Sequence, residues 1–276
     1  MTPSTADDLA FAVDLALRAG EILMDHYERL ERIQYKGARD VVTEADHESE
    51  ALILGAIRSR YPTDAIMAEE TGEHTADAGE APRSGRGRVW IADPLDGTIN
   101  YANGIPFFCV AIGLAVDGAP SVGVIRDPTR GETFAATADG PALLYTAASG
   151  SVPVPISASD KERASDFVIS MSLNGRAVAA RERSVRRVVR ISRNMGSAAL
   201  ALAYVANGRF DAMVQEGGLS PWDVAGAGLI AERGGATVTA SDGGPWFDLA
   251  HQPKSVGVLA APPAHHGMLL GLIRGR

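Results

Sequence analysis

The first sixty residues carry the periodicity of amphipathic helices. From Thr5 to about Leu30, apolar side chains recur at a helical spacing that begins with Leu9, Val13 and Leu17. A second helix is predicted over 44–60, because apolar positions there share one face and a Tyr-Pro dipeptide follows directly. The chain therefore opens with two helices, each with one face suited to a core.

After these helices, short apolar runs bounded by turn residues predict strands. Strands are expected at 65–67 and 88–93, and the segment between them, 71–87, is rich in Gly, Ala and charge and is expected to be a mobile surface loop. The run 107–128 is typical of two strands joined by an Asp-Gly turn, and 131–146 continues the meander. This half of the chain is expected to form an antiparallel sheet.

Beyond Pro155 helices and strands alternate. The predicted elements are strand 167–171, helices 177–190 and 197–207, strand 210–215, helix 221–233, strands 235–239 and 255–260, and a terminal helix. The pattern predicts a mixed α/β protein with a single domain over 1–276, divided into an N-terminal lobe of about 1–155 and a C-terminal lobe of about 156–276.

Composition narrows the class of protein. The net charge of −8 argues weakly against nucleic-acid binding, and the single cysteine, Cys109, excludes an internal disulfide. The N-terminus is acidic and polar, unlike a signal peptide, and the longest apolar run, 107–116, is about half the length of a membrane helix. A soluble, cytoplasmic protein with no membrane partner is expected.

Acidic residues stand at the ends of several predicted elements. Asp93 ends a strand and Asp96 follows three residues later, Glu69 and Glu70 follow another strand, and Asp223 lies in the first turn of a helix. Taken singly, these are ordinary features: a capping turn, a solvated loop and compensation of a helix dipole. Their shared position at element ends raises the further possibility that the side chains converge.

A converged set of carboxylates would need cations. Two carboxylates about 4 Å apart repel by roughly 4 kcal/mol at an effective dielectric constant of 20. Oxygen ligands alone select hard ions such as Mg²⁺, and the six histidines show no metal-ligand spacing. The sequence thus indicates a magnesium site rather than a zinc site.

The neighbouring residues suggest a phosphate substrate. Gly97 and Thr98 stand at a predicted helix start, where backbone N–H groups favour an anion, and the Thr hydroxyl can orient a water molecule. Lys36, Thr43 and Asp46 form a second polar group before the 44–60 helix, although capping alone would also account for them. These parts fit a metal-assisted attack by water on a phosphate ester.

The sequence lacks the motifs of other phosphatase classes. A cysteine-nucleophile phosphatase needs an arginine six residues after the cysteine, and Ala115 stands there. The strand end reads D-x-x-D instead of the D-x-D of aspartyl-phosphate enzymes, and neither a P-loop nor a G-x-S-x-G elbow occurs.

Several motifs together resemble the inositol monophosphatase family. They are Lys36 with DVVTEAD, AEET, WIADPLDGTINY, RNMGSAALALAYVANGRFDA and SPWDVAGAGLIAERGG, in family order over nearly the whole chain. The resemblance implies a layered αβαβα sandwich of the inositol monophosphatase and fructose-1,6-bisphosphatase type, usually a homodimer. It also implies a Mg²⁺-dependent phosphomonoester hydrolase with two to three ions at each site.

The resemblance further implies roles for individual residues. A first Mg²⁺ would be held by Glu69, Asp93, Thr98 and the carbonyl of Leu95, a second by Asp93, Asp96 and Asp223, and a weaker third ion would face Glu69. Thr98, hydrogen-bonded to Asp46, would orient the attacking water, so the implied catalytic residues are Thr98, Asp46 and Glu69. Substrate contacts would come from Lys36, Gly97, Thr98, Gly196, Ser197, Ala198 and Glu216.

The substrate and one alternative role stay open at this point. Inositol 1-phosphate or a related sugar or polyol monophosphate is favoured, with 3′-phosphoadenosine 5′-phosphate, fructose 1,6-bisphosphate and histidinol phosphate as alternatives. The arginine-rich segment 181–193 suggests a second hypothesis, an RNA-linked regulatory role. Val185, Val188 and Val189 instead favour an amphipathic helix with its arginines in solvent, and no aromatic residues interleave to stack bases, so nucleic-acid binding is not the predicted function.

Overall fold

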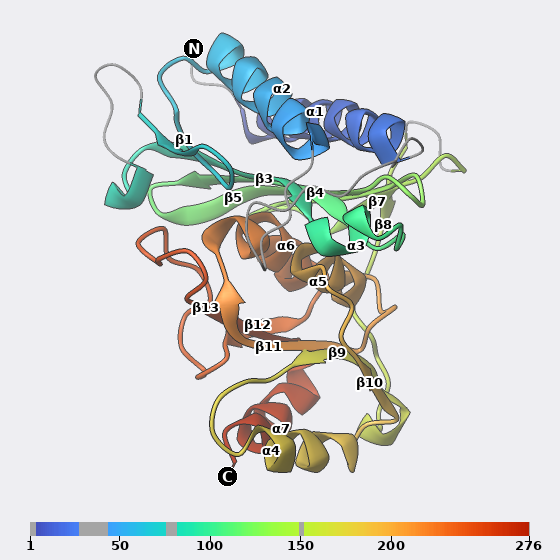
Figure 1. Ribbon diagram of the computed structural model, residues 1–276. Coiled ribbons are helices and arrows are strands. Elements are labelled where there is room, and N and C mark those ends of the chain that lie inside the picture. The colour runs from blue at the N-terminus through green and yellow to red at the C-terminus, as the bar shows by residue number, and fades with distance from the viewer. Residues whose placement is uncertain (1–3, 28–43, 76–81, 149–151, 276) are drawn as a thin grey trace.

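The chain folds into five alternating layers of helices and sheets. The computed structural model describes residues 4–27, 44–75, 82–148 and 152–275. Figure 1 shows two helices above a large sheet, two helices beneath it, then a smaller sheet, and two further helices on the outer side. The expected αβαβα sandwich is therefore confirmed.

The large sheet is mostly antiparallel and has one parallel pair. Its strands are β1 (Ala65–Ala68), β2 (Gly72–His74), β3 (Arg88–Asp96), β4 (Cys109–Val116), β5 (Ala119–Asp127), β6 (Glu132–Thr137), β7 (Leu143–Tyr145) and β8 (Val154–Pro155), in the spatial order β2-β1-β3-β4-β5-β6-β7-β8. Among the described strands of this sheet, β1 and β3 are the one parallel pair, so their carboxyl ends lie at the same edge of the sheet.

The helices α1 (Thr5–Tyr27) and α2 (Glu44–Arg60) cover the upper face of this sheet. Their apolar stripes bury Leu15, Leu23 and Ile53 completely, together with Trp90 of β3. The periodicity of the sequence thus produces the packing that it predicts, because each helix turns its apolar face onto the sheet.

The helices α5 (Ala198–Ala206) and α6 (Pro221–Arg233) lie between the two sheets. Every residue of α5 is buried, in keeping with a helix that is apolar on all sides. The helix α6 packs its backbone directly on β4 and β5: a Cβ atom at Gly226 would lie 2.6 Å from the carbonyl oxygen of Ile112, and one at Gly123 would lie 2.3 Å from that of Gly226. This close approach fixes the second turn of α6 against the large sheet.

The smaller sheet and its outer helices complete the fold. The sheet has the order β10-β9-β11-β13-β12, with β9 (Val168–Ser172), β10 (Ile191–Arg193), β11 (Ala212–Leu219), β12 (Thr237–Ala240) and β13 (Val256–Ala261). The helices α4 (Val178–Arg186) and α7 (Pro263–Ile273) cover its outer face (Figure 1). Short helices are α3 (Thr98–Ala102) and the 3₁₀ turns η1 (Pro82–Ser84) and η2 (Ala164–Asp166). No helix in the described ranges is both long and apolar enough to cross a membrane.

Two segments differ from the sequence predictions. The loop expected over 71–87 contains strand β2, which pairs with β1, and the turn η1. The helix expected over 177–190 ends at Arg186, and residues 191–193 form the edge strand β10 beside β9. Val185 and Val189 are buried as expected, so the apolar stripe was identified correctly although the helix extends over only part of it.

Candidate active site

The polar site begins where β3 ends. Asp93 pairs with Ala111 of β4 and Asp96 pairs with Cys109, so one extra residue of β3 is accommodated between them as a bulge. The backbone N–H of Leu95 donates to Asp93 Oδ1 at 2.9 Å, which fixes the buried Asp93 carboxylate. The bulge brings two aspartates to the same side of the strand end.

Asp96 is held at the N-terminus of α5. Its Oδ2 accepts hydrogen bonds from Ser197 Oγ at 2.6 Å and from the backbone N–H of Ala199 at 2.7 Å. Ser197 is also the N-cap of α5 and accepts from the N–H of Leu200 at 3.4 Å. The predicted substrate contacts Ser197 and Ala198 thus lie beside Asp96, at a helix start that favours negative charge.

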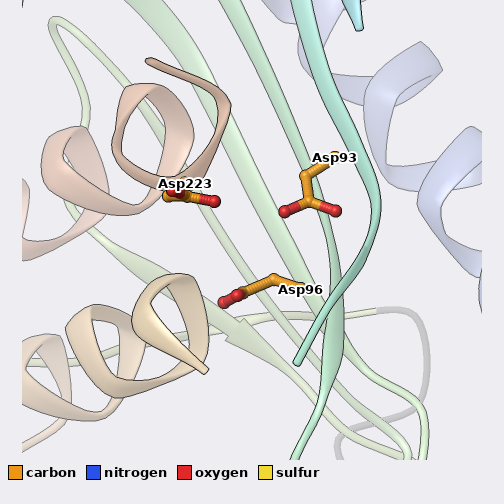
Figure 2. Close-up of side chains that lie close together, drawn as sticks. All are labelled: Asp93, Asp96 and Asp223. Atoms are coloured by element: carbon orange, nitrogen blue, oxygen red, sulfur yellow. The ribbon is translucent and has the colours of Figure 1, made fainter. Parts of the chain in front are cut away.

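Asp223 enters the cluster from the first turn of α6. Its Oδ2 accepts from the backbone N–H of Ser220 at 2.6 Å, so the side chain both caps the helix and faces the strand end. Figure 2 shows Asp93, Asp96 and Asp223 pointing toward one another from three backbone positions. One carboxylate oxygen of each lies within 4.8 Å of those of the other two.

Glu69 joins the cluster from the end of β1. Because β1 runs parallel to β3, the backbone N–H of Glu69 donates to the carbonyl of Ala92 at 3.2 Å, beside Asp93. The Glu69 and Asp93 carboxyl groups lie close enough to influence each other's pKa. The residue as a whole is exposed, but its carboxyl group is closely surrounded by protein atoms and by other acids.

Crowding raises the pKa of these carboxyl groups. Burial raises the pKa of Glu69 to about 7, a hydrogen bond with Asp93 opposes the rise, and neighbouring carboxylates add to it. Burial and repulsion from the other acids raise the pKa values of Asp93 and Asp223 well above the usual range. Burial also raises the pKa of Asp96, against hydrogen bonds from Ser197 and the first amides of α5. Without a cation, the cluster therefore retains protons that isolated carboxyl groups would have lost.

The donor set fits a hard divalent cation. Within the described ranges, no Lys, Arg or His forms an ion pair with Glu69, Asp93, Asp96 or Asp223. Such a set of converging oxygen atoms with no cationic side chain is what Mg²⁺ or Ca²⁺ prefers. The acidic triad of Asp93, Asp96 and Asp223 can therefore hold a metal ion.

Thr98, Leu95 and Asp46 lie around the same strand end. The Thr98 hydroxyl donates to the Leu95 carbonyl oxygen at 3.0 Å, so the two uncharged groups expected at the first ion are in direct contact. Asp46 is buried in the first turn of α2, close enough to raise the pKa of Glu69 by repulsion. Since a hydroxyl has one proton, Thr98 does not donate it to Asp46 in this arrangement, and their expected hydrogen bond stays a prediction.

Two glycines shape the space beside the acids. Gly97 has φ of +95°, and a Cβ atom there would lie 3.1 Å from the carbonyl oxygen of Phe107. Gly196 has φ of +80°, and a Cβ atom there would lie 2.9 Å from Nδ2 of Asn100. Both predicted phosphate or substrate positions therefore require glycine for their backbone conformation and for the space around them.

Asn100 is a residue of this region that the sequence did not single out. Its Nδ2 donates at 2.7 Å to the carbonyl oxygens of Phe107 and of Met195, which tie α3 to the loop before α5. A single Asn inside a predicted helix carries no local signal for such a contact, because its two acceptors lie 7 and 95 residues away in sequence.

Glu216 lies apart from the acidic triad, on β11 of the smaller sheet. Its carboxylate accepts from the Arg181 guanidinium and, at 3.1 Å, from the backbone N–H of Asn174. Arg181 in turn donates to the carbonyl oxygens of Asn174 and Ile273. Glu216, Arg181 and Asn174 line an open cleft of about 990 Å³ beside α4 and the end of α7. No feature of the sequence distinguished Arg181 from the other five arginines of segment 181–193 as the partner of Glu216.

Lys36, which is expected near the phosphate, and Thr43, which belongs to the same predicted polar group, lie outside the described residues.

Comparisons with known proteins place the chain in a family. The model of the inositol monophosphatase family matches residues 5–275. The chain is 36% identical to an inositol-1-monophosphatase of Synechocystis sp., with 92% of this chain and 89% of that protein covered. It is 33% identical to a fructose-1,6-bisphosphatase/inositol-1-monophosphatase of Thermotoga maritima (84% of each covered), and 34% identical to the Nus factor SuhB of Salmonella typhimurium (86% of each).

Solved structures show the same fold. The extragenic suppressor protein suhB of Bartonella henselae superimposes with a TM-score of 0.83 at 28% identity, covering 96% of this chain and 97% of that one. An IMPase of Thermotoga maritima gives a TM-score of 0.81 at 29% identity, covering 98% and 97%. With matching motifs, matching fold and a family model spanning almost every residue, the chain belongs to the inositol monophosphatase family of phosphoric monoester hydrolases.

Proposed function

We propose that the protein is a Mg²⁺-dependent phosphatase that hydrolyses inositol 1-phosphate, or a related sugar or polyol monophosphate, to the free alcohol and phosphate. The observation that carries the metal dependence is the triad of Asp93, Asp96 and Asp223, whose oxygens lie within 4.8 Å of one another with Glu69 alongside. The substrate preference rests on the relatives named as inositol monophosphatases and on the G-S-A-A-L segment with Glu216.

In this proposal two to three Mg²⁺ ions share the carboxylates. Glu69, Asp93, Thr98 and the Leu95 carbonyl would hold the first ion, and Asp93, Asp96 and Asp223 the second. Asp93 suits a shared ligand because one of its carboxylate oxygens lies within 4.8 Å of one of Asp223, and its carboxyl group is also close to that of Glu69. When bound, the ions supply Lewis-acid polarisation of the ester and a water molecule of lowered pKa.

The side chains and amides position the reacting groups. Thr98 Oγ, which donates to the Leu95 carbonyl in the structure, would accept a hydrogen bond from the attacking water. For Asp46 to take the Thr98 proton, the hydroxyl would have to turn from the Leu95 carbonyl toward Asp46. The amides of Gly97 and Thr98, together with Lys36, would bind the phosphate oxygens. Gly196, Ser197, Ala198 and Glu216 would face the alcohol part of the substrate.

A phosphate-release assay tests the proposal directly. Inositol 1-phosphate, fructose 1,6-bisphosphate, histidinol phosphate and 3′-phosphoadenosine 5′-phosphate should be compared at equal Mg²⁺, with kcat/KM highest for the first. Excess EDTA should abolish the activity, and added Mg²⁺ should restore it. Full turnover in EDTA would contradict the two-ion mechanism, whereas a preference for another ester would change the substrate alone.

A regulatory role is a second candidate because a relative is named a Nus factor and several arginines of 183–193 are exposed. Salt-dependent retention on RNA would support that role, and catalysis with no RNA affinity would argue against it.

We also propose that the protein is a homodimer and lies in the cytoplasm. Sedimentation would test the oligomeric state, and fractionation of cells would test the location.

A further inference from the structure

The turn that carries Glu69 is attached at two points. On one side, the Glu69 N–H donates to the carbonyl of Ala92 in β3 at 3.2 Å. On the other side, the Glu70 N–H donates to Glu50 Oε2 in α2 at 2.8 Å. A side chain from the helix layer thus holds the backbone next to a carboxylate of the site.

The same face of α2 contacts both acidic loops. Asp46, Ser49 and Glu50 are spaced at i, i+3 and i+4, and all three are no more than 1% exposed. Ser49 Oγ donates to the carbonyl of Pro94 at 3.2 Å, within the bulge that separates Asp93 from Asp96. This face therefore supports the Glu69 turn and the β3 bulge together.

One carboxylate oxygen of Glu50 makes no hydrogen bond within the described residues. This second oxygen, Oε1, is buried. A buried acceptor left without a partner destabilises the folded state, and more so when the group is charged. A glutamine at this position could accept the Glu70 N–H with its single side-chain oxygen. The presence of a second carboxylate oxygen in Glu50 therefore needs another explanation.

We propose that Glu50 is a positioning residue for the carboxylate site. By accepting the Glu70 N–H, Glu50 holds the turn at which Glu69 approaches Asp93. Its second oxygen provides one more hydrogen-bond acceptor when a cation occupies the carboxylate site. The inference rests on the proposed function, because it takes Glu69 to serve cation binding. Residues that orient metal ligands typically contribute 10- to 100-fold to metal affinity or activity.

The test compares Glu50→Ala and Glu50→Gln with Glu48→Gln, a control on an exposed position of the same helix. Calorimetry should measure the Mg²⁺ affinity of each protein, and Tm in EDTA should measure its metal-free stability. Glu50→Ala should bind Mg²⁺ about 10- to 100-fold more weakly. Glu50→Gln should lose less, since its amide oxygen can still accept the Glu70 N–H, and Glu48→Gln should match the wild type.

The outcomes separate positioning from a purely structural role. A lower Tm in EDTA with Mg²⁺ affinity within twofold of the wild type would overturn the inference. If Glu50→Ala does not fold, Glu50→Asp serves instead: it keeps the charge but shortens the reach, so it should bind Mg²⁺ more weakly than Glu50→Gln, and wild-type affinity would refute the inference. Absence of Mg²⁺ binding by the wild type would instead refute the proposed function.

Discussion

At the scale of single residues, the linear motif identified the acids but not what each of them contacts. The D-P-L-D-G-T segment marks Asp93 and Asp96 because two acids at a strand end are chemically unusual. That Asp96 is held by Ser197 and Ala199, about a hundred residues later, follows only from the packing of α5 on the sheet. The attachment of Glu216 to Arg181 depends in the same way on tertiary structure.

Replacing Thr98 tests the proposed water-positioning hydroxyl. Thr98→Ala should lower kcat by roughly 10²- to 10⁴-fold with little change in KM, because the lost contact matters mainly in the transition state. Thr98→Ser, which keeps the hydroxyl, is the matched control and should retain most of the activity. Steady-state kinetics with inositol 1-phosphate provide the measurement, and an effect on KM alone would place Thr98 in substrate binding.

Glu216 and Arg181 can be separated by the choice of substrate. Glu216→Gln should leave hydrolysis of p-nitrophenyl phosphate nearly unchanged, since that ester has no hydroxyl groups to recognise. On inositol 1-phosphate it should cost about 1.5–3 kcal/mol in kcat/KM, the contribution of a hydrogen bond to a charged group. Arg181→Gln should have a smaller effect if Glu216 contacts the substrate itself. Equal losses in both variants would show that Glu216 acts only through the ion pair.

At the scale of elements, hydrophobic periodicity predicted the long helices and the central strands. It missed β2 and β10, each three residues long at a sheet edge, because so short a segment shows no alternation and gains its conformation from its neighbour. It also overestimated α4, since apolar positions at 188 and 189 continue a helical spacing after the helix has ended. Local sequence cannot identify these short strands, because pairing with β1 decides β2 and pairing with β9 decides β10.

The contact of α6 with the large sheet leads to a stability prediction. Gly226→Ala should destabilise the protein by about 1–3 kcal/mol, even though Ala is the better helix former, because a Cβ atom would lie 2.6 Å from the Ile112 carbonyl oxygen. Gly55→Ala in α2 is the control: no heavy atom lies within 4 Å of its Cβ position, so a gain of about 0.4–1 kcal/mol is expected. Denaturant unfolding measures both, and a stabilised Gly226→Ala would contradict the packing described for α6.

At the scale of the whole molecule, the acidic site joins the two sheets. Glu69, Asp93 and Asp96 come from the large sheet, whereas Asp223 comes from the helix that follows β11 of the smaller one. The layered architecture was predictable from the order of elements and from the family resemblance, because alternating helices and strands must cover both faces of each sheet. Predicting that these four acids converge required the family resemblance as well. Their spacing alone could be explained by ordinary local roles such as helix capping.

The raised pKa values predict how stability depends on pH without metal. Carboxyl groups whose pKa is higher in the folded state stabilise it below the unfolded pKa, near 4, and this contribution is lost as pH rises through the folded pKa, about 7 for Glu69. In EDTA, Tm should therefore fall between pH 5 and pH 8, and Mg²⁺ should restore it at pH 8. Thermal unfolding monitored by circular dichroism provides the measurement.

A variant isolates the cluster from other titrating groups. Asp223→Asn keeps an oxygen that can accept the Ser220 N–H but removes one charge, so in EDTA at pH 8 it should be more stable than the wild type. Each 1 kcal/mol gained would raise Tm by roughly 2–4 °C. At pH 5 the two proteins should differ little, and the variant should bind Mg²⁺ weakly and hydrolyse every phosphate ester poorly. A variant less stable than the wild type at pH 8 would show that repulsion in the cluster is negligible.

The spread of the four acids along the chain also bears on synthesis. A ribosome releases Glu69, Asp93 and Asp96 early, but the triad lacks its third member until residue 223 has been added and α6 has docked on β4 and β5. A nascent or truncated chain that ends before this helix can therefore form the acidic strand end without a complete cation site. A ligand that binds only the finished fold stabilises that fold by mass action. Magnesium would therefore stabilise this protein only after synthesis has passed Asp223 and α6 has docked on the large sheet.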